Sequence, residues 1–210
     1  MNQLFNFRYK GSNFIMLSNR KEEERKYRQN LILDGALTIF KEKGLEKATM
    51  EEIASSSGFG TATLYYYFHS KDDVFAEILV RGWKTLWEGI EDIINSDINP
   101  EDKFLDTIYE IAGIVLKELN LYRFLFQAPQ TYPSISEQQP EWKTYQSRLY
   151  STLQGLLNDG IKVGVFPKLK PELLMKGIGG IFHGILLMGD GKKSMSKSDF
   201  KKLINELLNT

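Results

Sequence analysis

The segment from Thr49 to Phe68 most constrains how this chain can fold, because it encodes two short helices joined by a tight turn. Thr49 is followed three residues later by Glu52, which is the spacing of a capping box that starts a helix. Gly58 stands where that helix must stop and where the turn needs a left-handed backbone, which glycine adopts without penalty. Ala54 is small enough for a second helix, over residues 61–67, to cross the first. The segment therefore predicts a helix-turn-helix.

The rest of the chain predicts helices nearly from end to end, and no convincing period-two strand pattern is present. The other expected helices cover residues 23–43, 71–95, 100–118, 121–127, 141–163, 171–188 and 197–208. Gly44 is expected to cap the first of these, and Ser70 with Asp72 and Asp73 is expected to start the helix over 71–95. A proline-rich loop precedes residue 141.

These elements predict an all-α fold of about nine helices in two domains. Residues 23–72 form a three-helix domain that contains the helix-turn-helix, and residues 73–210 form a larger helical domain. Residues 1–22 are expected to be a flexible extension. Met16 is a second candidate for the first residue of the protein.

The composition excludes several classes of site. The chain contains no cysteine, which excludes a disulfide framework, a thiolate zinc site and a cysteine nucleophile. Its longest apolar run, residues 177–189, contains His183 and is shorter than the roughly 20 residues that a membrane span needs. The N-terminal residues do not have the apolar core of a secretion signal. We therefore expect a cytoplasmic protein without a membrane partner.

The formal net charge is zero, which does not by itself favour binding to nucleic acid. The charge is nevertheless distributed unevenly. Residues 2–21 carry only basic charges, residues 88–118 are strongly acidic, and lysine predominates after residue 168. These blocks are consistent either with surfaces that bind charged partners or with solvated helix faces of mixed sign.

The residues around the turn resemble the signature of the tetracycline-repressor (TetR/AcrR) family over roughly residues 32–79. The resemblance rests on Thr49 to Ala54, Gly58-Phe59, Ala62 to Phe75, and on Ala36, Phe40 and Gly44 upstream. It implies a homodimer whose recognition helices enter successive major grooves of a palindromic double-stranded operator. It also implies that the larger domain binds a small-molecule effector that releases the DNA. The expected function is that of a transcriptional regulator that acts as a repressor, with no catalytic activity, cofactor or metal.

Carried onto this sequence, the resemblance predicts a set of DNA contacts. The residues concerned are Thr49, Met50, Thr61, Ala62, Thr63, Tyr65, Tyr67 and Lys71. Thr49 and Lys71 would bind phosphates at helix N-termini. Glu51 also matches a position that contacts DNA in some members, but its negative charge disfavours a phosphate contact.

The recognition helix departs from the family pattern in two places. Gly60 replaces the usual serine or threonine cap, which glycine can tolerate. The helix also carries no arginine, so that sequence readout would rely on thymine-methyl contacts by Ala62 and Thr63 and on tyrosine hydroxyls. Because consecutive helical residues point about 100° apart, one of the three tyrosines at 65–67 is expected to pack inward.

The C-terminal half is rich in aromatic residues, which suits a pocket for an apolar or aromatic effector. The candidate lining residues are Phe104, Tyr109, Phe124, Trp142, Tyr145, Phe182 and His183. The alternative interpretation is that these aromatic side chains only fill the helical core. Gly177, Gly180 and Gly184 lie on one side of the helix over 171–188, where small residues let two helices approach closely. They predict a dimer interface.

Two other classes of function are compatible with an all-helical chain. An enzyme is disfavoured because His69 and His183 lie in different segments and no His-Glu-x-x-His or Gly-x-Ser-x-Gly motif is present. A helical interaction module, in which the helix-turn-helix serves only packing, remains an alternative that a DNA-binding assay separates from a regulator.

Overall fold

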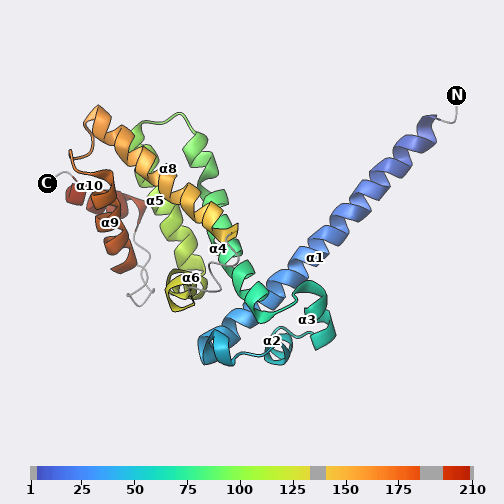
Figure 1. Cartoon of the computed structure of the whole chain (residues 1–210). Helices are drawn as coiled ribbons and strands as arrows, with labels where there is room; N and C mark the ends of the chain where they lie inside the picture. The colour runs from blue at the N-terminus through green and yellow to red at the C-terminus, as the bar shows by residue number, and fades with distance from the viewer. Residues whose placement is uncertain (1–3, 133–140, 185–195, 209–210) are drawn as a thin grey trace. The chain divides into compact units, whose positions relative to one another are not determined.

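The computed structural model describes residues 4–132, 141–184 and 196–208, and within these ranges the chain forms nine helices and no strand (Figure 1). The predicted all-α fold class is therefore confirmed. The chain divides into two compact units, Met1–Phe75 and Ala76–Thr210. The boundary predicted from the sequence, after residue 72, lies slightly earlier. No helix in the described ranges is long and apolar enough to cross a membrane.

The first unit contains α1 (Leu4–Lys47), α2 (Met50–Ser56), α3 (Thr61–Tyr67) and the start of α4 (Lys71–Asn95). Helix α1 starts at Leu4 and so includes most of residues 1–22, for which the sequence predicts an extension. No proline interrupts this segment, and the helical path continues until Gly44. The side chains of residues 19–28 are exposed on all sides of α1. This part of the helix extends beyond the packed core of the unit.

Gly44 interrupts the helical path of α1 with φ 76° and ψ 164°. This positive φ, which glycine adopts without penalty, breaks the helix at the residue where the sequence predicts its end. The core of the unit then forms from one face of α1 together with α2, α3 and α4. Ile32, Ile53 and Leu64 are fully buried, and the Phe40 and Phe75 rings meet edge to face with centroids 6.4 Å apart. Hydrophobic packing therefore holds the two short helices against α1.

The second unit contains the rest of α4, α5 (Pro100–Lys117), α6 (Leu119–Thr131), α8 (Glu141–Val163), α9 (Pro171–Phe182) and α10 (Lys197–Leu208). Helix α5 lies beside α6, α8 and α10, and α8 lies beside α9 (Figure 1). Helix α6 is longer than the predicted 121–127. The α-helical part of α9 ends at Phe182 and is followed by a π-helical turn at 183–184, and the remainder of the predicted helix lies outside the described residues.

Part of the acidic segment 88–118 holds α10 against α5. Lys201 lies 3.0 Å from the Asp102 carboxylate and 2.6 Å from that of Asp106, and Lys197 lies 3.1 Å from Asp106. Although burial opposes the effect, hydrogen bonds from Lys201 and Lys197 lower the pKa of Asp106. These carboxylates are consequently intramolecular partners of the C-terminal lysines.

Candidate DNA-binding face and ligand cavity

The start of α2 is fixed by the predicted capping box. The Glu52 N–H donates to the Thr49 hydroxyl at 3.3 Å, and the Thr49 N–H donates to the Glu52 carboxylate at 3.2 Å. Glu52 also accepts a hydrogen bond from Lys43 of α1, which lowers the pKa of the Glu52 carboxyl. The cap therefore joins α2 to α1 and fixes the angle at which α2 begins.

The turn between α2 and α3 takes the conformation that the sequence predicts. Gly58 has φ 75°, in the left-handed region. The Phe59 N–H donates to the Ala54 carbonyl at 2.9 Å, and Ala54 itself is buried. Gly60 occupies the N-cap of α3 without a side-chain hydrogen bond, and α3 forms nonetheless. The two short helices are thus joined in the geometry of a helix-turn-helix.

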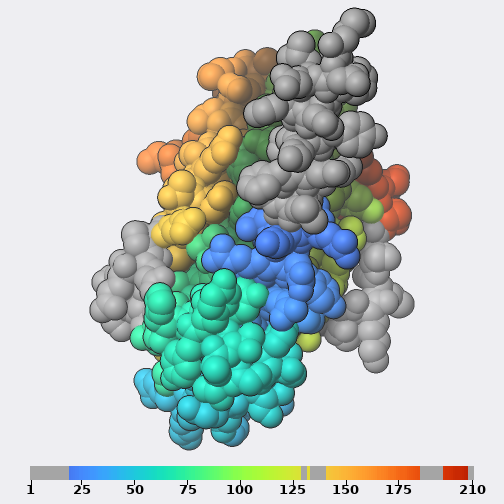
Figure 2. Space-filling view, turned by 90° about the vertical axis from the view of Figure 1, so that its right-hand side faces the viewer, coloured from blue at the N-terminus to red at the C-terminus, as the bar shows by residue number. Residues whose placement is uncertain are grey.

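Helix α3 presents an uncharged polar and aromatic face. Leu64 is fully buried and anchors the helix, whereas Tyr65 and Tyr66 are 48% and 75% exposed. Tyr67 is half-buried and its ring contacts that of Tyr66 edge to face, with centroids 5.1 Å apart. The three residues at 61–63 are exposed or half-buried. Figure 2 shows α3 at the surface of the molecule.

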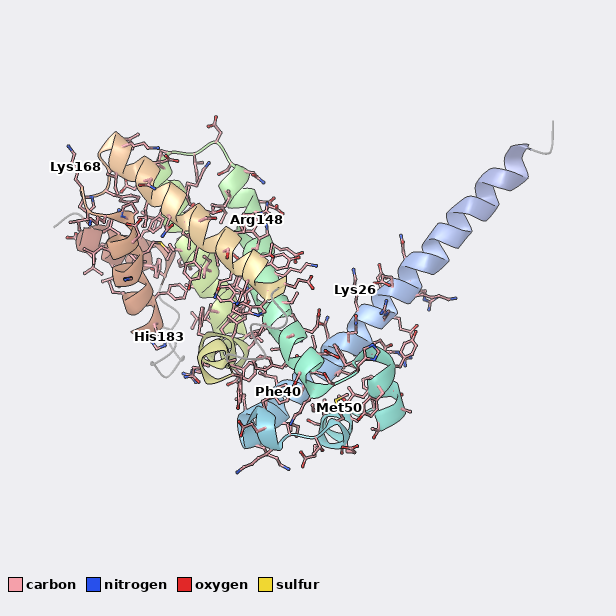
Figure 3. All side chains as sticks on the ribbon, viewed as in Figure 1. Lys26, Phe40, Met50, Arg148, Lys168 and His183 are labelled. Carbon is pink, nitrogen blue, oxygen red and sulfur yellow. The ribbon has the colours of Figure 1, made fainter. Side chains whose placement is uncertain are left out.

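Two of the predicted DNA-contacting residues are engaged within the protein. Met50 is only 7% exposed and its side chain points into the core near Phe40 (Figure 3). Its position as the first residue of α2 serves packing, so a side-chain contact from Met50 to DNA does not fit the structure. The ammonium group of Lys71 donates to the carbonyls of Glu46 at 2.8 Å and Ala48 at 3.1 Å. Since an ammonium group has three donors, one remains for a phosphate.

Residue Tyr66 belongs to the exposed face although the sequence analysis did not select it. The sequence does indicate that Tyr66 is exposed, because Leu64 and Phe68 are four residues apart and both are buried. Positions 65 and 66 must then lie away from the core. Exposed basic residues are also present on α1, among them Arg25 and Lys26, and Figure 3 shows Lys26 on this helix. They add positive charge to a unit whose recognition helix has none.

The second unit contains a cavity of about 830 Å³ between its helices. The walls from α4, α5 and α6 are apolar and aromatic. They consist of Trp83, Leu86, Ile108, Ile111, Leu125 and Phe126, with Gln127 at the end. The walls from α8 and α9 contain polar side chains next to apolar ones. They consist of Gln146, Leu149, Tyr150, Leu153 and Gln154 on α8, and of Glu172, Met175, Lys176, Ile178, Gly179, Phe182 and His183 on or just after α9. This division fits an amphipathic ligand.

The structure brings only part of the predicted pocket together. Phe182 and His183 line the cavity, and His183 lies at the end of α9 (Figure 3). Phe104 packs on Phe166 and Tyr109 on Phe200, at ring-centroid distances of 5.4 and 5.7 Å, so both fill the core. Phe124, Trp142 and Tyr145 are likewise absent from the described lining. These five residues therefore do not belong to the described walls of this cavity.

The sequence analysis also missed the polar row on α8. Gln146, Tyr150 and Gln154 are four residues apart and therefore share one face of the helix, next to the buried Leu149 and Leu153. The four-residue spacing of these polar residues is the sequence feature from which the row could have been predicted. Within the described parts of the chain, no group of three or more histidine, cysteine, aspartate or glutamate side chains is arranged to hold a metal ion.

The three glycines predicted to form a dimer interface lie on an open surface of α9. A Cβ atom built on Gly177 or Gly180, or on Gly184 just after α9, would meet no atom of the described residues within 4 Å. Leu173, one turn before Gly177, is 59% exposed. Leu173 and Gly177 lie on a different face of the helix from Ile178 and Phe182, which line the cavity, and Gly180 lies between the two faces, one turn after Lys176.

Comparisons with known proteins agree with this architecture. Residues 32–78 match the family model described as bacterial regulatory proteins, tetR family. The chain is 26% identical over 176 residues to IcaR of Staphylococcus aureus, the negative transcriptional regulator of the biofilm operon icaADBC. That match covers 82% of this chain and 76% of IcaR. The chain is also 28% identical over 189 residues to YfiR of Bacillus subtilis, an uncharacterized HTH-type transcriptional regulator, covering 83% of this chain and 88% of YfiR.

The fold is also similar to that of solved regulators. AibR, whose crystal structure contains isovaleryl coenzyme A and operator DNA, superposes with a TM-score of 0.71 at 15% identity. The superposition covers 86% of this chain and 97% of AibR. The matched segment 32–78 contains the capping box, the left-handed glycine and the exposed face of α3 described above. Residues 32–78 therefore form a DNA-binding domain of the tetR family of bacterial regulatory proteins, and the chain is a DNA-binding transcriptional regulator.

Proposed function

We propose that this regulator is a repressor that binds a palindromic operator as a homodimer and leaves it when a small molecule occupies the cavity. The observation that carries the proposal is the course of α4. This helix starts with Lys71 beside the helix-turn-helix and continues into the second unit, where Trp83 and Leu86 line the cavity. The same helix thus contributes residues to both sites, which gives the chain an element through which the two sites can be coupled.

The relatives support this proposal. IcaR is named as a negative regulator, and AibR has been crystallised with both a coenzyme A ester and operator DNA. By analogy, the cavity of this chain would hold an effector that is apolar or aromatic in part, and occupancy would lower the affinity for the operator.

On the DNA side, we assign base and groove contacts to the exposed face of α3. Its residues are Thr61, Ala62, Thr63, Tyr65, Tyr66 and Tyr67. Phosphate contacts are assigned to Thr49 at the start of α2 and to Lys71 at the start of α4, where the positive end of the helix dipole adds attraction for an anion. Because α3 contains no lysine or arginine, the salt-dependent part of the affinity comes from outside the recognition helix.

For the homodimer, we assign the contact surface to the open face of α9 around Gly177, Gly180 and Gly184. The absence of side chains there allows a second helix to approach closely. A dimer is also what a palindromic site requires, since each half-site is read by one helix-turn-helix.

A gel-shift titration on DNA from upstream of the protein's own gene tests the proposal. We expect sequence-selective binding that weakens steeply with salt, and release by a molecule that binds the cavity. Binding that is equally tight on scrambled DNA, or absent at low salt, would support the alternative of a helical interaction module.

A further inference from the structure

One polar atom in the wall of the cavity has no partner. The Trp83 side chain lines the cavity and is 2% exposed, and its indole N–H has no hydrogen-bond acceptor among the described residues. Trp87, one turn later on α4, differs in this respect because its N–H donates to Glu91 at 3.4 Å. Buried donors without an acceptor are rare in folded proteins, since burial removes the water that would otherwise bind them. An unpaired donor in a cavity wall points to an acceptor supplied by a ligand.

The surroundings of Trp83 allow such an acceptor to enter. The rings of Phe126 and Tyr150 contact the indole, with centroids at 5.7 and 6.0 Å. Tyr150 is 44% exposed, so its ring can turn aside without leaving a packed core. The floor next to Trp83 is apolar, with Leu86 and Leu125 from neighbouring helices.

The cavity wall also contains a second side chain that favours a ligand with a hydrogen-bond acceptor. An indole N–H and an ammonium group can only donate hydrogen bonds, and Lys176 lines the cavity together with Trp83. Glu172 is the single acid among the described lining residues, and it lies four residues before Lys176 on α9, where the two charges offset each other. A cationic ligand therefore finds little net attraction, whereas an oxygen acceptor finds at least two donors.

The length of the cavity is indicated by α9. Its lining residues run from Glu172 to His183, eleven positions apart, which at about 1.5 Å per residue corresponds to roughly 16 Å. We propose that the effector is an elongated apolar molecule that carries a carboxylate or carbonyl oxygen, and that this oxygen accepts the hydrogen bond of the Trp83 indole. The inference rests on the proposed role of the cavity as the effector site, but the contact is measurable without DNA.

Isothermal titration calorimetry on the full chain tests the head group with three ligands that share one alkyl tail. Dodecanoate and methyl dodecanoate carry acceptor oxygens, and dodecyltrimethylammonium carries a cation. We expect the first two to bind and the cation to bind at least about tenfold more weakly. Tighter binding of dodecanoate or of its ester identifies the carboxylate or the carbonyl as the preferred form. Equal or tighter binding of the cation, or no binding of either acceptor, would overturn the proposal.

Substitution of Trp83 tests the contact itself. Trp83→Phe keeps an aromatic ring but removes the N–H, and we expect it to weaken dodecanoate binding about fivefold to tenfold, the effect of one hydrogen bond. Trp87→Phe is the matched control, because it removes the indole N–H of a tryptophan that donates to Glu91 and does not line the cavity, and it should leave the affinity unchanged. Full affinity in Trp83→Phe, or an equal loss in Trp87→Phe, would show that Trp83 is not the donor.

NMR on the wild-type chain gives a second measurement in case Trp83→Phe does not fold. With ¹⁵N-labelled tryptophan, dodecanoate should move the Trp83 indole N–H resonance downfield and leave that of Trp87 in place. The signals are assigned from Trp87→Phe and Trp142→Phe. An unmoved Trp83 signal at saturation contradicts the inference. Dodecanoate binding through Trp83 without any operator binding would instead contradict the proposed repressor function and leave the ligand assignment intact.

Discussion

Gly35 on α1 lies directly against Ser57, the residue that ends α2. A Cβ atom on Gly35 would stand 2.8 Å from both the Cβ and the backbone nitrogen of Ser57. Ser57 cannot easily retreat, because its hydroxyl and its backbone N–H both donate to the Ile53 carbonyl, at 2.8 and 3.0 Å. The close approach of α1 and α2 therefore depends on the absence of a side chain at position 35.

Gly35→Ala should lower the free energy of unfolding by roughly 1–3 kcal/mol, the usual effect of overpacking a core. Thermal unfolding followed by circular dichroism measures it. Gly155→Ala is the matched control, since a Cβ there meets no atom within 4 Å in the described parts of the chain, and alanine in a helix is expected to stabilise by about 0.5–1 kcal/mol. Equal melting temperatures for the two variants would contradict the close packing at Gly35.

Lys71→Met should weaken binding to specific and random DNA by the same factor. The lysine is held in place by the carbonyls of Glu46 and Ala48, so its remaining donor can bind a phosphate, which carries no sequence information. The slope of log affinity against log salt concentration should fall by about one. Lys162→Met on α8 serves as the control. A lower melting temperature with an unchanged salt slope would show that Lys71 is structural only.

Thr63→Ala should change sequence preference and leave binding to random DNA unchanged. Loss of one methyl contact to a base is expected to reduce discrimination at one base pair by about 1 kcal/mol. Competition among operators randomised at single positions measures the change. Thr38→Ala, which alters an exposed threonine of α1, should behave as wild type. A uniform loss on all sequences would remove Thr63 from the readout residues.

Gly180→Arg should dissociate the proposed dimer. A long charged side chain on the open face of α9 prevents a second helix from approaching closely. Sedimentation velocity should then show a monomer, with operator affinity reduced at least about tenfold since only one half-site is read at a time. Ser147→Arg places the same side chain on an exposed position of α8 and should remain dimeric. A dimeric Gly180→Arg variant would place the interface elsewhere.

Acid should weaken the attachment of α10. Hydrogen bonds from Lys201 lower the pKa of Asp102 and, against the effect of burial, that of Asp106. A carboxyl group whose pKa is lower in the folded state contributes stability above its unfolded pKa, and this contribution is lost as the pH falls through the folded pKa. Wild type should therefore lose more stability than Lys201→Met between about pH 5 and pH 2. Lys84→Met should follow the wild-type curve, and parallel curves for Lys201→Met would exclude the contribution.

The sequence predicted the helix-turn-helix well because its signals act over a few residues. The Thr49 capping box and the left-handed Gly58 each specify local geometry without reference to the rest of the chain. The cavity could not be predicted in the same way. Trp83, Phe126 and Tyr150 come from three helices, and their meeting depends on how those helices pack. For the same reason aromatic content alone could not distinguish them from Phe104, which is paired with Phe166 in the core.

The contacts of Lys71 could not be predicted from the sequence either. Its place at a helix start is visible in the sequence, but its two carbonyl partners lie more than twenty residues earlier in the chain. Met50 is a case in which a position matched by family resemblance is occupied by a side chain that the core needs.

The two faces of α9 have a thermodynamic consequence. Ile178 and Phe182 line the cavity, whereas Gly177 and Gly180 stand on the surface proposed for the dimer. If an effector binds the dimer more tightly than the monomer, dimerisation must strengthen effector binding by the same factor that the effector strengthens dimerisation. The concentration of the protein would then set its sensitivity to the effector, and the two dissociation constants could not evolve independently.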